Sequence, residues 1–428
     1  MTDDKAQRFS TLAVHGGAVV DPHSKARATP IYQTTSFCFD DVDHAAALFN
    51  LEQFGNIYTR IMNPTQNVLE ERMAALEGGT AALATASGHG AQLLVLHCLM
   101  SPGDEIIAAR QLYGGSLNQF GQSFQKFGWQ VKFADITDSE GFAALVNDRT
   151  RAIFVESIAN PGGIVTDLEA LSKIARAAGV PLIVDNTLAT PYLCQPKKFG
   201  ADIIVHSMTK FLGGHGNSLG GVLIDCGSFD WMASDKYPTL SQPSESYHGL
   251  VMGETFGPMA LAIAARVLSL RDLGPCISPF NAFLIATGME TLPLRMQKHT
   301  DNALEVARYL SQHDQVSWVS YAGLPDSPYH ELAKRICAGG AGAVFTFGLK
   351  GGYDAGVKLV NAVELFSHLA NVGDTRSLII HPASTTHRQL EAGARAAAGA
   401  GDDVVRLSVG IEDVQDILYD LEQALQKL

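Results

Sequence analysis

The sequence is short of basic residues, with 31 Lys and Arg against 44 Asp and Glu and a formal net charge of −13. Proteins that bind nucleic acid present clustered Lys and Arg to the phosphate backbone, and we expect no nucleic-acid partner. No apolar run approaches the roughly 20 residues that cross a bilayer, and residues 1–10 lack the apolar core of a secretory signal. We therefore expect a soluble, cytoplasmic protein that acts on small molecules and makes no membrane contact.

Cysteine is also scarce, since the six cysteines lie far apart and none belongs to a CxxC pair. Zinc ribbons and dithiol redox motifs need such pairs, so we expect reduced, mostly buried thiols and no metal site. No GxGxxG follows an apolar run, which argues against a dinucleotide-binding fingerprint. What is present is a chain of 428 residues, 46% of them hydrophobic, which is enough for two or three domains.

Short apolar runs alternate with amphipathic stretches along the middle of the chain. The runs that we expect to form buried strands are 105–109, 152–155, 182–184, 203–205 and 222–224. The stretches that we expect to be helical are 64–77, 91–100 and 168–178. This alternation predicts an α/β fold with a mostly parallel sheet, whose ligands bind beyond the carboxyl ends of the strands.

The remaining stretches predict how the chain divides. After a long ordered loop at 228–257, which we expect beside a site, further strands and helices predict a smaller C-terminal α/β domain. Its expected strands are 343–349, 378–380 and 404–409, and its last helix is 414–425. We predict an N-terminal arm over 1–63, a large domain over 64–270 and the C-terminal domain over 271–428.

Two reactive side chains follow neighbouring strands. Asp185 follows the run 182–184, and Lys210 follows the run 203–205. An Asp at a strand end is more often a cap, and a Lys is more often solvated. Two adjacent strands would nevertheless bring this pair to one rim, where the hydroxyls of Ser207 and Thr209 could hold a phosphate. We interpret His206, in the same segment, as a core histidine because no second metal ligand lies at a suitable spacing.

A second glycine-rich element, 85–90, precedes the apolar stretch 91–100. If that stretch is helical, the free N–H groups at its start form an anion site through Gly88 and His89. A plain glycine turn that merely starts a helix explains the same residues equally well.

Eight motifs in order resemble the Cys/Met-metabolism family of pyridoxal-phosphate (PLP) enzymes. They are Tyr58-x-Arg60, Ser87-Gly88, Leu112-Tyr113-Gly114-Gly115, Glu156-Ser157-x-x-Asn160-Pro161, Val184-Asp185-Asn186-Thr187, Ser207-x-Thr209-Lys210, His381-Pro382-Ala383-Ser384 and Arg406-x-Ser408-Val409-Gly410. The resemblance extends from about Thr11 to the C-terminus. It implies the fold of aspartate aminotransferase, with a mostly parallel seven-stranded sheet in the large domain.

The resemblance also implies catalytic roles. Lys210 would carry PLP as a Schiff base and move protons, and Asp185 would keep the pyridine nitrogen protonated. Tyr113 would stack on the ring and act near the leaving group. Arg406 would bind the substrate α-carboxylate through its planar fork.

Further roles concern how the cofactor is held. By the resemblance, Asn160 contacts its phenolic oxygen, and its phosphate is bound by the backbone amides of Gly88 and His89 and the hydroxyls of Ser207 and Thr209. Histidine at position 89 departs from the family, in which methionine or glutamine is commoner.

Two residues of the arm would serve a neighbouring subunit. Tyr58 and Arg60 resemble the pair that reaches the phosphate, and in the case of Tyr58 the substrate, of an adjacent copy. This implies a homo-oligomer, at least a dimer with shared active sites, and family members usually form tetramers.

Four segments resemble one branch of the family, which replaces the acetate of O-acetylhomoserine with sulfide or methanethiol to give homocysteine or methionine. They are 246–249, 270–274, 278–283 and 290–295. Gly115 stands where methionine γ-lyases carry a cysteine, which counts against that reading. Methionine γ-lyase, cystathionine γ-synthase, O-succinylhomoserine sulfhydrylase and a catalytically silent binding protein remain alternatives. The sequence leaves open which acyl group and which thiol are used. It also leaves open whether the oligomer is a dimer or a tetramer and whether residues 228–257 move as a lid.

Overall fold

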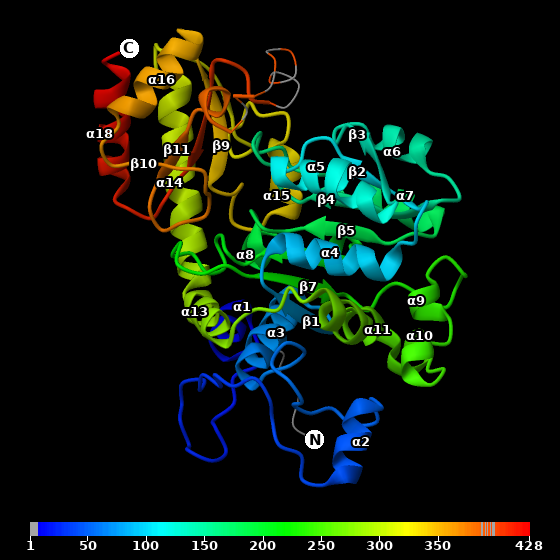
Figure 1. Ribbon diagram of the computed structural model, residues 1–428. Helices are drawn as coiled ribbons and strands as arrows, with labels where there is room; N and C mark the ends of the chain where they lie inside the picture. The colour runs from blue at the N-terminus through cyan, green and yellow to red at the C-terminus, as the bar shows by residue number, and fades with distance from the viewer. Residues whose placement is uncertain (1–6, 387, 390, 392, 394, 396–398) are drawn as a thin grey trace.

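The computed structural model describes residues 7–386, 388, 389, 391, 393, 395 and 399–428, and it contains two β-sheets (Figure 1). The larger sheet has seven strands in the order β1-β7-β6-β5-β4-β2-β3. They are β1 (Ala81–Thr85), β2 (Glu105–Ala109), β3 (Gln130–Ala134), β4 (Thr150–Glu156), β5 (Leu182–Asp185), β6 (Ile203–Ser207) and β7 (Gly221–Asp225). Only β7 runs antiparallel to its neighbours. The predicted mostly parallel seven-stranded sheet is therefore confirmed.

The inner strands of this sheet are apolar because both faces are covered. All residues of β2 and β7 are buried, as is nearly all of β4. Helix α4 (Gly88–Leu99) packs against β1, β6 and β7, and helix α7 (Leu168–Ala178) packs against β4 and β5. The sheet is thus a rigid core that presents strand ends at its rim.

Two helices show why the predicted boundaries agree with the structure. Helix α3 (Pro64–Glu77) begins where the Asn63 side chain accepts the N–H of Thr65, and it ends at Gly78 with φ of 71°. Helix α7 begins with the equivalent cap from Asp167. Side-chain caps and left-handed glycines are signals that a sequence carries by itself.

The second sheet has five strands in the order β10-β11-β12-β9-β8. They are β8 (Val316–Ser320), β9 (Val344–Leu349), β10 (Ser367–His368), β11 (Leu378–Ile380) and β12 (Val404–Ser408). Helix α16 (Gly352–Ala362) packs on β9 and β12, and α18 (Val414–Leu425) packs on α16. Helix α14 (Leu292–Gln312) follows α13 (Pro279–Met289) and packs on β8, on α18 and on α8 (Thr190–Leu193), so it links the two sheets (Figure 1).

From residue 7 to residue 63 the chain forms two short α-helices, α1 (Phe9–His15) and α2 (Val42–Phe49). The stretch between them and after α2 extends away from the body of the chain (Figure 1). Several of its large apolar side chains are exposed, including Val19, Phe49 and Phe54. These features are typical of an arm, while the predicted boundaries at 63/64 and 270/271 stay predictions.

One predicted loop differs from the structure. Residues 228–257 include the helices α9 (Pro238–Ser241) and α10 (Met252–Phe256), and none of them lines the pocket described below. The expectation that this stretch lies beside a site therefore stays a prediction. Its Ser, Pro and Gly content indicated irregular backbone correctly for much of its length, but such a composition does not say which surface a loop covers.

The described residues give three further findings, on cysteines, on helix length and on acidic and metal-ligating side chains. The cysteines are all free, and four of them, Cys98, Cys194, Cys226 and Cys337, are buried. No helix within the described ranges is both long and apolar enough to cross a bilayer. Nor do three or more His, Cys, Asp or Glu side chains gather there in a way that would hold a metal ion.

Close contact between α4 and β7 depends on a glycine. A Cβ atom at Gly221 would lie 2.0 Å from the backbone oxygen of Ser87. We expect Gly221→Ala to lower the free energy of unfolding by about 1–3 kcal/mol, because the backbone must move to relieve the overlap. Chemical denaturation of both proteins measures the change. Gly121→Ala is the matched control, since its Cβ would lie 3.8 Å from the nearest atom, in Phe133. An equal loss in both variants would contradict this explanation.

Candidate functional site

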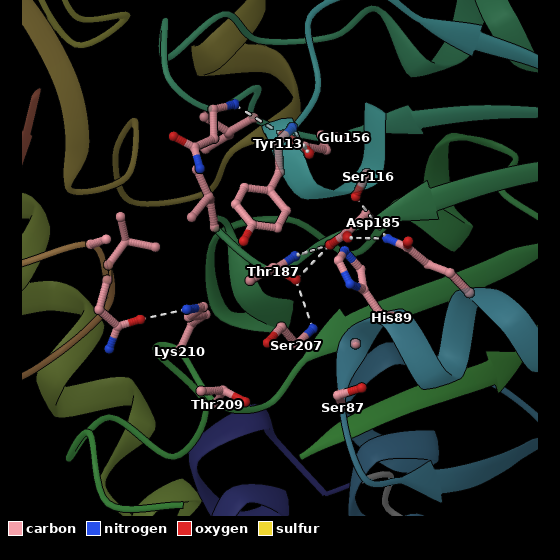
Figure 2. Close-up of a pocket in the computed structure, with 18 of the residues that line it drawn as sticks. Ser87, His89, Tyr113, Ser116, Glu156, Asp185, Thr187, Ser207, Thr209 and Lys210 are labelled. Carbon is pink, nitrogen blue, oxygen red and sulfur yellow. Dashed lines mark hydrogen bonds between the residues drawn. The ribbon is translucent and has the colours of Figure 1, made fainter. Parts of the chain in front are cut away.

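A pocket lies where the carboxyl ends of the parallel strands meet the smaller sheet (Figure 2). Its lining comes from loops after β1, β2, β4, β5 and β6 together with β12 and the segment before β11. The lining residues are Ser87, Gly88, His89, Gln92, Tyr113, Ser116, Glu156, Ile158, Asn160, Asp185, Thr187, Leu188, Ser207, Thr209, Lys210, Leu219, Ala370, Asn371, Val372 and Arg406. The pocket therefore includes every predicted site residue except Tyr58 and Arg60.

Lys210 is the nucleophile candidate, and it lies three residues beyond the end of β6. Its amine Nζ donates to Oδ1 of Asn371, across the gap between the two sheets. Burial and, to a smaller extent, the nearby charge of Arg406 lower the pKa of Lys210 to about 8. Roughly a tenth of the amine is therefore neutral at pH 7, far more than for an ordinary lysine, and a nucleophile or base requires this neutral form.

Asp185 ends β5 and is held by several donors. Its Oδ1 accepts the backbone N–H of Thr187 at 3.0 Å and the hydroxyl of the same residue at 2.5 Å, while its Oδ2 accepts from Gln92 at 3.3 Å. Burial raises the pKa of Asp185, whereas these donors and the nearby His206 oppose the rise. A cationic ring nitrogen would further favour the carboxylate, and the donors already fix its orientation.

His206 itself is a core residue, as predicted from its position in an apolar strand. It is fully buried, and its Nε2 lies 2.6 Å from Oε1 of the buried Glu77. The same Glu77 oxygen accepts from Asn186. This polar group lies behind the site and supports the strand that carries Asp185.

The start of α4 lies where the anion site is predicted. Ser87 caps the helix by accepting the N–H of Gly90 at 3.1 Å. The N–H groups of Gly88 and His89 also lie in the first turn and have no intrahelical carbonyl to bind. A Cβ at Gly88 would lie 3.0 Å from that of Ser207, which is tighter than ordinary contact, so a side chain there would press on Ser207. These two N–H groups and the Ser207 hydroxyl face one space, and the helix dipole favours negative charge there.

Thr209 completes this corner of the pocket. Its hydroxyl donates to the Gly220 oxygen at 3.2 Å and accepts the Gly220 N–H at 3.1 Å. The hydroxyl is therefore fixed in place beside Lys210 by the loop that leads into β7.

Tyr113 and His89 lie together on one side of the pocket. Their ring centroids are 5.9 Å apart with an interplanar angle of 32°. The imidazole Nε2 is buried without a partner among the described residues, so the side chain of His89 as well as its backbone belongs to the site. Sequence reasoning assigned only the backbone. A Cβ at Gly115 would lie 2.4 Å from the ring of Tyr113 and 3.0 Å from that of His89, so these rings require glycine at 115.

Arg406 enters from β12 of the smaller sheet. Its guanidinium donates to Oδ1 of Asn160 at 3.3 Å and to the backbone oxygen of Asn371 at 3.2 Å. Burial lowers the pKa of Arg406 to about 10, which still leaves it charged at neutral pH. A half-buried guanidinium close to Lys210 is suited to a substrate carboxylate.

Tyr58 and Arg60 lie outside the pocket of their own chain. Both are exposed in the N-terminal arm, where the guanidinium of Arg60 lies 5.6 Å from the ring centroid of Tyr58. Their predicted role toward another subunit therefore stays a prediction.

Several pocket residues escaped the sequence reasoning. Glu156 ends a buried strand just as Asp185 does, so the same signal could have identified it. Gln92 lies one turn into α4 from Gly88, which a helical projection places on the same face. No sequence signal marks Asn371, which reaches Lys210 only through the packing of the two sheets.

Comparison with a solved structure gives the class of protein. A protein from Campylobacter jejuni assigned as an O-acetylhomoserine (thiol)-lyase, in which a lysine carries a pyridoxyl monophosphate group, is 38% identical and superposes with a TM-score of 0.95. The match covers 98% of this chain and 100% of that one. The fold is that of PLP-dependent enzymes.

Comparison with known sequences gives the family. The model of the Cys/Met metabolism PLP-dependent enzymes matches residues 10–426. The O-acetyl-L-homoserine sulfhydrylase of Leptospira meyeri is 51% identical, over 98% of this chain and 96% of that protein. The O-acetyl-L-homoserine sulfhydrylase 1 of Thermus thermophilus is 50% identical, over 98% and 100%. The chain belongs to the Cys/Met metabolism PLP-dependent enzyme family.

The pocket fits PLP on its own geometry. It offers a partly neutral amine at Lys210, a carboxylate at Asp185 and two backbone N–H groups with a hydroxyl for a phosphate. Glycine at position 88 keeps the corner beside Ser207 free of a side chain, so a phosphate can approach the backbone.

The lowered pKa of Lys210 predicts a pH profile for cofactor capture. In cofactor-free protein the neutral amine should reach half of its maximum near pH 8, because burial disfavours the ammonium form. The rate at which added PLP is bound, followed by absorbance, should rise up to about pH 8 and level off above pH 9. Free Nα-acetyl-lysine in the same buffers is the control and should keep rising toward pH 10. A protein rate that also rises through pH 10 would contradict the lowered pKa.

Proposed function

We propose that this protein catalyses PLP-dependent γ-replacement on O-acetylhomoserine. Acetate leaves from Cγ and sulfide or methanethiol adds at the same carbon, which gives homocysteine or methionine plus acetate. One observation carries the proposal: Lys210, Asp185 and Arg406 surround the same pocket, so an amino acid can meet an amine, an electron-withdrawing site and a carboxylate binder at once. The choice of O-acetylhomoserine is supported by the relatives that share about half of the residues.

Each side chain has a role that follows from its position. The carboxylate of Asp185 would pair with the pyridine nitrogen, and Asn160 would contact the phenolic oxygen. The N–H groups of Gly88 and His89, with the hydroxyls of Ser207 and Thr209, would bind the phosphate. Bound PLP supplies an electron-poor ring that stabilises negative charge on the substrate carbon beside the amino group.

The remaining residues would act on the substrate. The amine of Lys210, once released from the cofactor, would remove the proton from the substrate carbon that bears the amino group. It would then return a proton to the substrate. Arg406 would bind the α-carboxylate by two parallel N–H donors. Tyr113 would stack on the ring, with its hydroxyl near the leaving acetate, and its ring position is supported by the absence of a side chain at Gly115.

The acyl group provides a direct test. With sulfide present, O-acetyl-L-homoserine should be turned over at least about 10-fold more efficiently than O-succinyl-L-homoserine, a difference of roughly 1.4 kcal/mol in transition-state binding. Homocysteine formation in a coupled assay measures both values of kcat/KM. Strong turnover of the succinyl ester with none of the acetyl ester would refute the proposed substrate. Steady release of ammonia and 2-oxobutanoate from methionine would instead indicate a γ-lyase.

We also propose that the active unit is at least a dimer in which Tyr58 and Arg60 complete the site of the adjacent subunit. Support comes from their exposure in an arm that projects from the body of the chain and from the absence of both residues from their own pocket. The exposed apolar side chains of the same arm are also suited to an interface between copies. We further propose the division at 63/64 and 270/271.

Sharing of sites predicts complementation between two inactive variants. Arg60→Ala and Lys210→Ala should each be inactive alone. Co-expressed with different tags and purified as hybrid dimers, they should regain roughly half of the wild-type activity, because one of the two sites in each hybrid has both residues intact. An inactive hybrid made of well-folded subunits would show that Arg60 serves its own chain.

A further inference from the structure

Glu156 is a buried carboxylate that connects two loops of the pocket. It is the last residue of β4 and 5% exposed. Its Oε1 accepts the backbone N–H of Tyr113 at 2.7 Å, and its Oε2 accepts the backbone N–H of Asn160 at 2.9 Å. Figure 2 shows its carboxylate beside Tyr113 at the upper end of the pocket. Both oxygens are thus occupied by the loops that follow β2 and β4.

These two loops carry groups with different tasks. The first carries the ring of Tyr113, which is half-exposed toward the pocket. The second carries Asn160, whose Oδ1 accepts from Arg406. One carboxylate therefore links the backbone under the aromatic ring to the pair that would bind the substrate carboxylate.

The electrostatic surroundings do not favour a carboxylate at this place. Glu156 pairs directly with Asp185 in the β4–β5 register, so two acidic side chains end adjacent strands. Burial and the charge of Asp185 raise the pKa of Glu156, whereas the two backbone N–H donors favour its carboxylate form. A neutral residue would avoid both costs, which indicates that the two acceptor positions matter to the site.

We propose that Glu156 is a positioning residue that fixes Tyr113 relative to the Asn160–Arg406 pair, and that it needs both carboxylate oxygens to do so. The proposal rests on the function proposed above, because it concerns the ring and the guanidinium that would hold the cofactor and the substrate. Displacement of reacting groups by about 1 Å can lower rates by roughly 100-fold.

Two variants separate geometry from charge. Glu156→Gln keeps the length of the side chain but replaces one oxygen acceptor with an amide NH₂ group. That donor would then face one of the two backbone N–H donors. Glu156→Asp keeps the charge but shortens the reach by one methylene group. We expect both to lower kcat/KM by roughly 10- to 100-fold, with lower kcat and higher KM, because both the ring and the guanidinium shift. Should Glu156→Gln fail to fold, Glu156→Asp carries the same expectation.

Asp225→Asn is the matched control. Asp225 is also a buried strand-end carboxylate that accepts backbone N–H groups, from Gly227, Leu261 and Ala262, and it lies outside the pocket. It should lower Tm much as the Glu156 variants do and leave kcat/KM within about twofold of the wild type. Loss of stability without a kinetic change in the Glu156 variants would overturn the proposal. Wild-type kinetics in Glu156→Asp beside a loss in Glu156→Gln would also overturn it, because charge alone would then suffice.

A binding measurement keeps this test independent of the substrate assignment. L-norleucine has an α-amino group and an α-carboxylate but no leaving group, so its binding can be followed by the visible absorbance of the bound cofactor. We expect its Kd to rise at least about 10-fold and the absorption band to shift in the Glu156 variants but not in Asp225→Asn. An unchanged Kd and spectrum would overturn the role of Glu156 even if the wild type proved inactive toward O-acetylhomoserine.

Discussion

The pairing of β5 with β6 is the constraint on which the site depends. Parallel register places Asp185 opposite Val205, so the chain that continues from β6 returns to the same rim and delivers Lys210 there. Because both strands are buried, a slip of the register would expose apolar side chains and remove the carboxylate from its position. The packing energy of the sheet therefore fixes the relative position of Asp185 and Lys210, and no local interaction between them is needed.

Prediction of the fold from the sequence succeeded where elements are central and failed at edges. The inner strands β4 to β7 are covered on both faces and appear as continuous apolar runs. The missed strands β1 and β3 are the two edges of the large sheet, and β8 is an edge of the small one. In β3 and β8 several side chains are partly or fully exposed, so Lys132 and Trp318 interrupt the pattern that a buried strand would show.

The site, like the fold, could be predicted from the sequence only in part. Lys210, Asp185 and the start of α4 were identifiable because strand ends and glycine turns leave local signals. The partners that orient them are set by tertiary packing: Asn371 reaches Lys210 from the other sheet, and the imidazole of His89 fills space next to Tyr113. Glu156 stood in a motif, yet its contacts with two separate loops become visible only in three dimensions.

The pocket draws its amine from one sheet and its guanidinium from the other, with α14 packed against both parts. An amino acid held by its nitrogen and by its carboxylate would consequently act as a cross-link between two structural units. Its affinity would then add to the cohesion of the whole subunit by mass action. Binding of the substrate and contact between the units would strengthen each other by the same free energy. A change that loosens this contact would therefore weaken substrate binding, even if it lies far from the reacting carbon.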